Sequence, residues 1–242
     1  MRRFAPLLLV VLAGCGSSPR APAPESAAAP RAFSPAPEHP RRPHGRWLTA
    51  RITAPVRMRA SPGGHALAAR LRPHTEFGSP KVVSVLRRSR GWLEVVVPER
   101  PNGRPAWIPA SAARLGAVDV SLHVNRGGRR LVVQRGSRVV RRLPVAVGRP
   151  GTATPTGRFA VTDKLRTRQL DSPYGCCALA LSGHQPHLLA GWPGGDRLAI
   201  HATPQAGTVG TAASLGCLRA RTRDMRALMR IVPLGAPVFV SG

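Results

Sequence analysis

The 242-residue chain is poor in acidic residues, aromatic residues and lysine. It carries 10 Asp and Glu against 37 Lys and Arg, only two of them lysines, which gives a formal charge of +27. Hydrophobic residues make up 43%, enough to build a core, so a wholly disordered chain is excluded. Aromatic residues make up only 4%, which argues against a nucleic-acid surface built on base stacking.

Long hydrophobic runs are also missing after the N-terminus. None approaches the ~20 residues that a membrane-spanning helix needs, so a polytopic membrane protein is excluded. Four cysteines are too few to form a disulfide scaffold in a chain of this length. Pro (26) and Gly (25) are abundant, which disfavours a mostly helical protein. We therefore expect a mainly β fold.

Residues 1–15 are typical of an export signal. Two arginines precede a short apolar segment, which ends in Leu-Ala-Gly-Cys at Cys15. This ending resembles the signal of bacterial lipoproteins, in which the Cys is lipidated and becomes the mature N-terminus. The resemblance implies lipidation of Cys15 and an extracytoplasmic protein, anchored to the cell membrane and facing the cell wall. The alternative is an ordinary export signal in which Cys15 is incidental.

Export changes the meaning of the positive charge. A cytosolic basic protein would suggest nucleic acid as a partner, whereas outside the membrane the polyanions are lipid headgroups and cell-wall polymers. We therefore expect no nucleic-acid partner. Nonspecific attraction to an anionic envelope and a solvated compositional bias explain the charge equally well.

Composition divides the remainder into a linker and two domains. Residues 16–46 hold eight Pro and seven Ala, which predicts a disordered tether. Residues 47–116 contain short β-branched runs between Gly, Pro and Asn turns, which predicts a small all-β barrel. Its segments VRMRASPGG, GWLEV and AWIP resemble bacterial SH3-like domains. Residues 117–242 continue the β pattern, and alternating Val and Leu from Val118 onward predict consecutive hairpins. One amphipathic helix is predicted near the C-terminus, with Thr222 as a candidate N-cap and an apolar face on which Met225, Leu228, Met229 and Val232 recur at i, i+3, i+4 and i+7.

The chemistry concentrates in residues 200–219, IHATPQAGTVGTAASLGCLR. A predicted buried strand ends at His201, and Cys217 follows sixteen residues later, between Gly216 and a nearby Arg219. A free thiol is mostly protonated at neutral pH, so attack on a carbonyl needs a base, and a neighbouring His can supply it. Arg219 offers a forked donor for a substrate carboxylate. From the residues alone, this pattern indicates Cys/His acyl transfer or a buried, inert thiol.

The same stretch resembles the catalytic motif of the L,D-transpeptidase (YkuD-like) family: Ile-His at a strand end, a Gly/Thr-rich loop, then Ser-x-Gly-Cys-x-Arg. Upstream, VGRPGTATPTGRF resembles the strands that enter that family's substrate face. The resemblance implies a peptidoglycan L,D-transpeptidase in residues 117–242. Its Cys attacks the diaminopimelate–D-Ala bond of a stem peptide and forms a thioester. It then passes the acyl group to an amine, giving a 3→3 cross-link.

Carried onto this chain, the resemblance makes Cys217 the nucleophile and His201 the general base and acid. Arg219, Ser214 and Gly216 become substrate-site residues: Arg219 would pair with a carboxylate and Ser214 would support the loop. The amides of Gly216 and Cys217 would form an oxyanion hole. We expect no metal or cofactor, peptidoglycan stem peptides as substrate and a monomer.

Two positions depart from the family pattern. Ala202 follows the catalytic His where many members have Gly, and Leu215 stands where many have His. An imidazole is therefore missing before Gly-Cys, which puts activity in question.

The remaining cysteines, Cys176 and Cys177, are adjacent. They are interpreted as two buried thiols, as a vicinal disulfide or as part of a metal site with His184 and His187, although that spacing is not a standard zinc pattern.

Two other functions remain open at this stage. The first is a hydrolase of the same architecture, in which water accepts the acyl group. The second is a catalytically silent, wall-binding lipoprotein.

Overall fold

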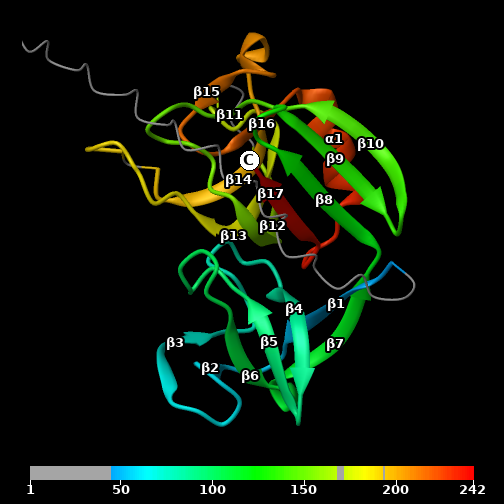
Figure 1. The fold of residues 1–242 in the computed structure, drawn as a ribbon, viewed down its shortest axis with the longest axis vertical. Helices are drawn as coiled ribbons and strands as arrows, with labels where there is room; N and C mark the ends of the chain where they lie inside the picture. The colour runs from blue at the N-terminus through cyan, green and yellow to red at the C-terminus, as the bar shows by residue number, and fades with distance from the viewer. Residues whose placement is uncertain (1–44, 168–171, 193) are drawn as a thin grey trace, which may run out of the picture. The chain divides into compact units, whose positions relative to one another are not determined.

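The computed structural model describes residues 45–167, 172–192 and 194–242, which belong to one compact unit. The predicted export signal, Cys15 and nearly all of the linker lie outside the described residues. The described chain is mainly β, as predicted, with one α-helix near its C-terminus (Figure 1). None of the helices in this described part is both long enough and apolar enough to cross a membrane.

The first sheet contains seven antiparallel strands in the order β3-β2-β6-β5-β4-β1-β7. Its alternating Val, Leu and Ile side chains bury one core, which includes Ile52, Met58, Leu71, Leu93 and Ile108. Strand β7 pairs with β1 as far as Val118, two residues beyond the predicted domain limit of 116. The strands are β1 (Trp47–Ile52), β2 (Val56–Arg59), β3 (Ala66–Leu71), β4 (Val82–Ser89), β5 (Trp92–Val96), β6 (Ala106–Pro109) and β7 (Ala113–Val118).

The second sheet has eight strands in the order β10-β9-β8-β17-β12-β13-β14-β16. The predicted hairpins are present as β8–β9 and β9–β10, whereas β8–β17 and β14–β16 are parallel. Strands β11 (Val147–Gly148) and β15 (Ala212–Ser214) form a separate parallel pair. The eight are β8 (Val120–Asn125), β9 (Arg130–Arg135), β10 (Arg138–Pro144), β12 (Gly157–Arg166), β13 (Cys177–His184), β14 (Arg197–Ala202), β16 (Leu218–Ala220) and β17 (Pro237–Ser241).

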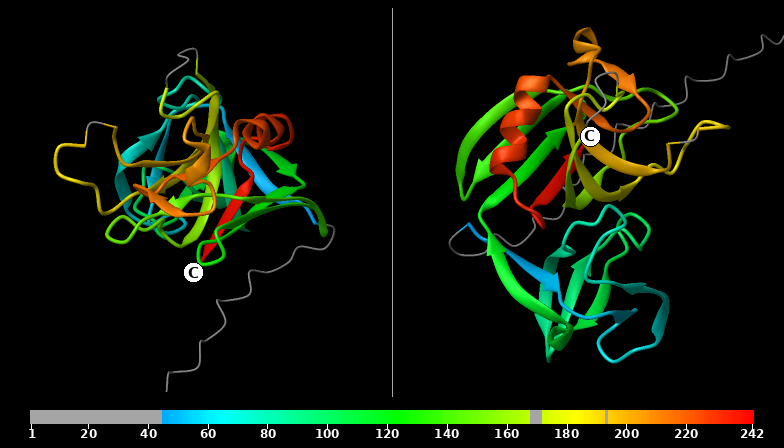
Figure 2. Two further views of the ribbon diagram at one scale, coloured as in Figure 1. Left: turned by 90° about the horizontal axis from the view of Figure 1, so that it is seen from above. Right: turned by 180° about the vertical axis from the view of Figure 1, so that it is seen from behind.

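The helix α1 (Thr222–Ile231) packs against β13 and β14 (Figure 2). Its Met225 and Leu228 are fully buried, so the predicted apolar face is the core face. The predicted cap is wrong: the N-cap is Arg221, no side chain caps the helix, and Thr222 is its first helical residue. Asp224 in the first turn still complements the positive end of the helix dipole.

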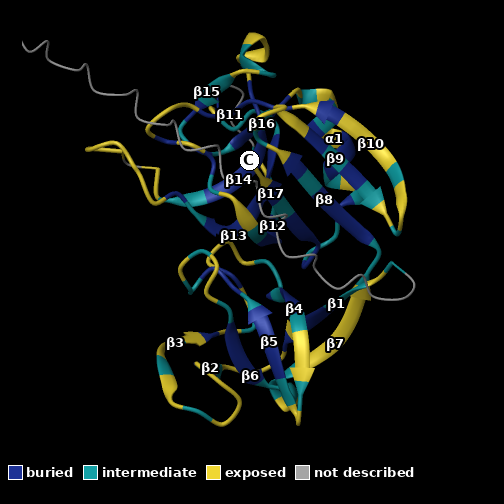
Figure 3. Ribbon diagram, in the orientation of Figure 1, coloured by how far each residue is buried: buried dark blue, intermediate teal, exposed yellow. Residues whose placement is uncertain are grey.

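The core of the second sheet is centred on strands β12, β13 and β14, which are buried along most of their length (Figure 3). Phe159 on β12 is the largest fully buried side chain of the described residues. Gly183 on β13 makes room for it, because a Cβ at that position would lie 2.6 Å from the Phe159 ring and 2.9 Å from a Leu198 methyl. The β13 backbone and the Phe159 ring therefore approach each other more closely than they could if residue 183 had a side chain.

Gly183→Ala should accordingly lower the free energy of unfolding by about 1–3 kcal/mol, the usual cost of overpacking a core. Phe159→Leu in the same background should recover part of that loss by making space. Gly207→Ala is the matched control, because an added Cβ there meets nothing within 4 Å. Urea denaturation of the three variants measures the effect; equal midpoints for Gly183→Ala and Gly207→Ala would contradict it.

Candidate functional site

The candidate active site lies where strands β14 and β16 run side by side at the edge of the second sheet. Their parallel register pairs His201 with Arg219. Cys217 directly precedes β16, so its backbone comes level with Ala199. Its sulfur lies 3.9 Å from the Arg197 carbonyl oxygen, and the nearby Ala199 amide favours the thiolate and so acts to lower the pKa of Cys217. The strand pair thus brings thiol, imidazole and guanidinium to one place.

Tyr174 lies against the His201 imidazole, although the sequence did not predict it. Its ring meets that of His201 edge-on, with centroids 5.1 Å apart and planes at 73°. Burial, and to a lesser extent the negative charge of the Cys217 thiolate, raises the pKa of Tyr174. Within the described residues no hydrogen bond joins the His201 ring to the Cys217 sulfur. The only sequence signal was that Tyr174 is the single tyrosine of the chain.

The Ser214 hydroxyl closes the turn that carries the cysteine. It accepts a hydrogen bond from the Gly216 amide at 3.1 Å and donates to the Cys217 carbonyl at 2.5 Å. Ser214 is 1% exposed, so its hydroxyl is committed to the loop. The Gly216 amide is therefore already hydrogen-bonded within the loop.

Gly216 is required by its backbone and by its neighbour Gln185. Its φ of 122° is disfavoured for residues with a side chain, and a Cβ there would lie 2.1 Å from the Gln185 amide nitrogen. That buried amide donates to the carbonyls of Thr152, Ala153 and Leu215, at 3.0, 3.2 and 3.1 Å. Gln185, another residue missed from the sequence, thus fixes the cysteine loop to the loop before β12.

Burial dominates the electrostatics of the thiol. It raises the pKa of Cys217 above that of a free thiol, while the Ala199 amide and the Arg219 charge act in the opposite direction to a smaller extent. Cys217 is the free cysteine of the described residues. In the resting protein at neutral pH this group is therefore a thiol.

Burial also dominates at His201, which is 4% exposed. It lowers the pKa of His201 to about 4; a hydrogen bond to the Ala202 carbonyl opposes that shift, and the charge of Arg219 adds to it. The bond runs from Nδ1 and measures 2.6 Å. Since a carbonyl oxygen can only accept, Nδ1 carries the proton and Nε2 is the basic nitrogen. The imidazole is therefore neutral at pH 7.

The two departures from the family pattern have different surroundings. Ala202 is fully buried, and Gly175 faces it so closely that a Cβ on Gly175 would lie 2.7 Å from the Ala202 methyl. The extra methyl of Ala202 is thus accommodated by a glycine. Leu215 is partly buried, and its carbonyl accepts from Gln185.

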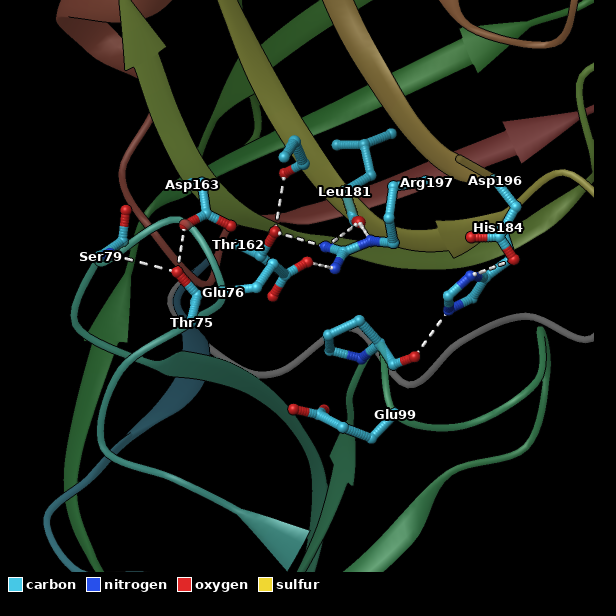
Figure 4. Close-up of polar contacts among 12 residues, drawn as sticks. Thr75, Glu76, Ser79, Glu99, Thr162, Asp163, Leu181, His184, Asp196 and Arg197 are labelled. Carbon is cyan, nitrogen blue, oxygen red and sulfur yellow. Dashed lines mark hydrogen bonds and ion pairs between the residues drawn. The ribbon is translucent and has the colours of Figure 1, made fainter. Parts of the chain in front are cut away.

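The other candidate ligands are the remaining cysteines and two histidines. Cys176 and Cys177 are joined in a vicinal disulfide, one of the three interpretations left open. His184 contacts Asp196 through Nδ1 at 2.9 Å and the Pro98 carbonyl through Nε2 at 2.6 Å (Figure 4). His187 is exposed. Among the described residues no three His, Cys, Asp or Glu side chains gather as a metal site would require.

Comparisons with known proteins point to one family. Residues 119–240 match YkuD, the L,D-transpeptidase catalytic domain. The Bacillus subtilis (strain 168) protein named as L,D-transpeptidase YkuD is 31% identical over 147 residues, which are 61% of this chain and 74% of that protein. The Bacillus licheniformis protein of the same name is 32% identical over 118 residues, 49% of this chain and 63% of its own. A solved L,D-transpeptidase structure from Mycobacterium smegmatis is 17% identical, with a TM-score of 0.42, over 59% of this chain and 76% of that one.

Arg219→Ala should raise the pKa of Cys217, because the guanidinium charge favours the thiolate. Iodoacetamide should then modify Cys217 more slowly near neutral pH, and the difference should vanish above the pKa of the thiol. Mass spectrometry of the Cys217 peptide over about pH 6 to 10 measures this profile. Arg221→Ala, two residues further on and exposed, is the control. Identical profiles for the two variants would contradict the electrostatic role of Arg219.

Proposed function

Because the chain belongs to the YkuD family of L,D-transpeptidase catalytic domains, we propose that it is a peptidoglycan L,D-transpeptidase with Cys217 as nucleophile. The observation that carries this proposal is the pairing of β14 with β16. It places a free thiol and a neutral imidazole with an unprotonated Nε2 at one sheet edge, beside an arginine. These are the three groups that acyl transfer from a carboxylate-bearing peptide requires.

In the acylation step the Cys217 sulfur attacks the carbonyl carbon of the diaminopimelate–D-Ala bond. The thiol proton passes to Nε2 of His201 as the sulfur–carbon bond forms. The tetrahedral intermediate then collapses, the carbon–nitrogen bond breaks, and His201 returns the proton to the departing D-Ala amine. Because both groups are neutral at rest, the proton transfer accompanies the attack and does not precede it.

In the second step an amine of a neighbouring stem peptide attacks the thioester. His201 takes a proton from this amine, the new amide bond forms, and the thiol is regenerated. The product is a 3→3 cross-link. If water attacks instead, the product is a tripeptide stem, and the protein is a hydrolase of the same architecture.

The neighbouring residues stabilise the oxyanion, shape the cysteine loop and bind the substrate. The Cys217 amide donates to the oxyanion, since the Gly216 amide is held by Ser214. Ser214 and Gly216 act by shaping the loop, and Arg219 binds the substrate carboxylate. Tyr174 borders the thiol and the imidazole and limits the approach of water.

The substrate of this family lies in the cell wall, outside the cytoplasmic membrane. We propose that a lipid on Cys15 anchors this protein there, that residues 16–46 are its tether and that residues 47–116 are an SH3-like domain. A lipid anchor would keep the full-length protein on membranes through a high-salt wash but not through detergent. Release by salt alone would contradict the anchor.

Cys217→Ala should abolish acylation by tetrapeptide stems, because no thioester can form. Cys176→Ser should leave most of it intact, since that cysteine is bonded to its neighbour. Mass spectrometry after incubation with tetrapeptide muropeptides distinguishes the outcomes. A cross-linked dimer supports the transpeptidase and a tripeptide supports the hydrolase. Absence of any product from the wild type would favour a silent wall-binding protein.

The pH dependence of acylation should reflect the lowered pKa of His201. Below about pH 4 His201 is protonated and cannot accept the thiol proton, so single-turnover acylation should fall as pH decreases through about 4. An unshifted His would lose activity near its ordinary pKa of about 6.5. His201→Ala should slow acylation by about 10²–10⁴-fold and remove the acid limb. Circular dichroism at each pH controls for unfolding; an acid limb near 6.5 would contradict the neutral, buried base.

A further inference from the structure

Arg197, at the start of β14, connects the first sheet to the strands of the candidate active site (Figure 4). Its guanidinium donates to the Leu181 carbonyl from Nε at 3.1 Å and from Nη2 at 2.7 Å. Nη2 also donates to the Thr162 hydroxyl at 3.0 Å, and Nη1 forms an ion pair with Glu76 in the loop between β3 and β4. One side chain thus joins strands β12, β13 and β14 to the first sheet.

An irregularity in the β13–β14 ladder explains why an arginine is needed here. Ala180 pairs with Ala199, but the next partners are His184 and Arg197, so β13 carries extra residues between these positions. The Leu181 carbonyl lies in this interval. A buried carbonyl without a partner is costly, and the guanidinium of Arg197 satisfies it where the ladder does not.

Further loops of the first sheet hold the strands on both sides of Arg197. The Thr75 hydroxyl donates to the fully buried Asp163 carboxylate at 2.5 Å. The Asn102 side chain makes two bonds to the backbone of His184: its amide donates to the carbonyl at 2.7 Å, and its oxygen accepts from the amide at 2.9 Å. Loops of the first sheet therefore contact β12 through Thr75 and β13 through Asn102, in the same way that Glu76 contacts β14 through Arg197.

The backbone that Arg197 anchors is also the backbone that contacts the thiol. The Arg197 carbonyl accepts from the Cys217 sulfur at 3.9 Å. Two residues along the same strand, Ala199 is level with Cys217 in the β14–β16 register, and its amide acts to lower the pKa of the thiol. The thiol form of Cys217 therefore has the Arg197 carbonyl as its partner, and the thiolate form has the Ala199 amide, both on β14. The position of this part of β14 therefore determines how strongly the thiolate is stabilised.

We propose that Arg197 is a positioning residue through which the first sheet, by way of Glu76, sets the reactivity of Cys217. Glu76 holds the guanidinium, the guanidinium holds β14 against β13, and β14 presents the Ala199 amide to the sulfur. The inference deepens the proposed function, and depends on it only in taking Cys217 as the reacting group. The first sheet is then part of the catalytic apparatus.

The test compares Glu76→Gln with Asp119→Asn. Both remove a half-exposed carboxylate from an ion pair, with Glu76 46% and Asp119 49% exposed, but Asp119 pairs with Arg135 far along the chain from β14. The readout is the rate of iodoacetamide modification of Cys217 against pH, which needs no substrate. Single-turnover acylation at saturating and at low tetrapeptide concentration is the second readout.

For Glu76→Gln, a positioning role and a simple charge effect predict opposite shifts of the pH profile of Cys217 modification. Removing a negative charge would by itself favour the thiolate, whereas loss of the Ala199 contact disfavours it. We expect the profile to move to higher pH, with modification near neutral pH slowed about two- to fivefold, the range for one exposed ion pair. The acylation rate constant should fall while the half-saturating tetrapeptide concentration is unchanged. Arg219, Tyr174 and His201, the ionisable groups facing the thiol, are unaltered.

A second variant tests Arg197 itself. Arg197→Ala should shift the modification profile further than Glu76→Gln, and Arg197→Lys should restore it only in part, because an ammonium group cannot span the same acceptors. An unchanged profile for Glu76→Gln, or a shift to lower pH, would overturn the proposal, as would an equal shift in Asp119→Asn. If the modification shift occurs but wild type acylates no tetrapeptide, the positioning role stands and the proposed function fails.

Discussion

The parallel pairing of β14 with β16 is the constraint on which the candidate active site depends. It is a contact between two short segments at the edge of a sheet, and a parallel pair has no tight hairpin to set its register. The register is fixed instead from outside the pair. Ser214 and Gln185 hold the loop before β16, and Arg197 holds the beginning of β14. A change of register by one residue would place Arg219 away from His201 and Cys217 away from Ala199.

Burial, rather than an ion pair, determines the protonation states of Cys217 and His201 before substrate binds. The imidazole is buried and the thiol is partly buried, and each is shifted toward its neutral form. Arg219 favours the ionised thiol but disfavours the protonated imidazole, so it cannot stabilise an ion pair between them. Charge therefore develops only when a substrate arrives. A neutral thiol is a weak nucleophile, so attack on a carbonyl requires a well-placed base.

The sequence was sufficient for features that depend on local patterns. Alternation of Val and Leu identified the hairpins of the second sheet, and the spacing of Met225 and Leu228 identified the buried face of α1. Strand-end and loop motifs located the segment that holds His201 and Cys217. The contributions of Tyr174 and Gln185 could not be predicted, because each acts on residues 27 or more positions away through a three-dimensional contact. The network around Arg197 was invisible for the same reason: its partners come from four separate segments.

The contact between Gly216 and Gln185 also limits how this protein can evolve. No residue with a side chain fits at 216 while Gln185 keeps its position, since the two would share the same space. Shortening Gln185 first would release three carbonyls that it now satisfies. Each single change passes through a less stable intermediate, so the two positions can drift only together. Variation in homologues should therefore be correlated at these two sites, even though they are separated by thirty residues of sequence that contain the exposed loop before β14.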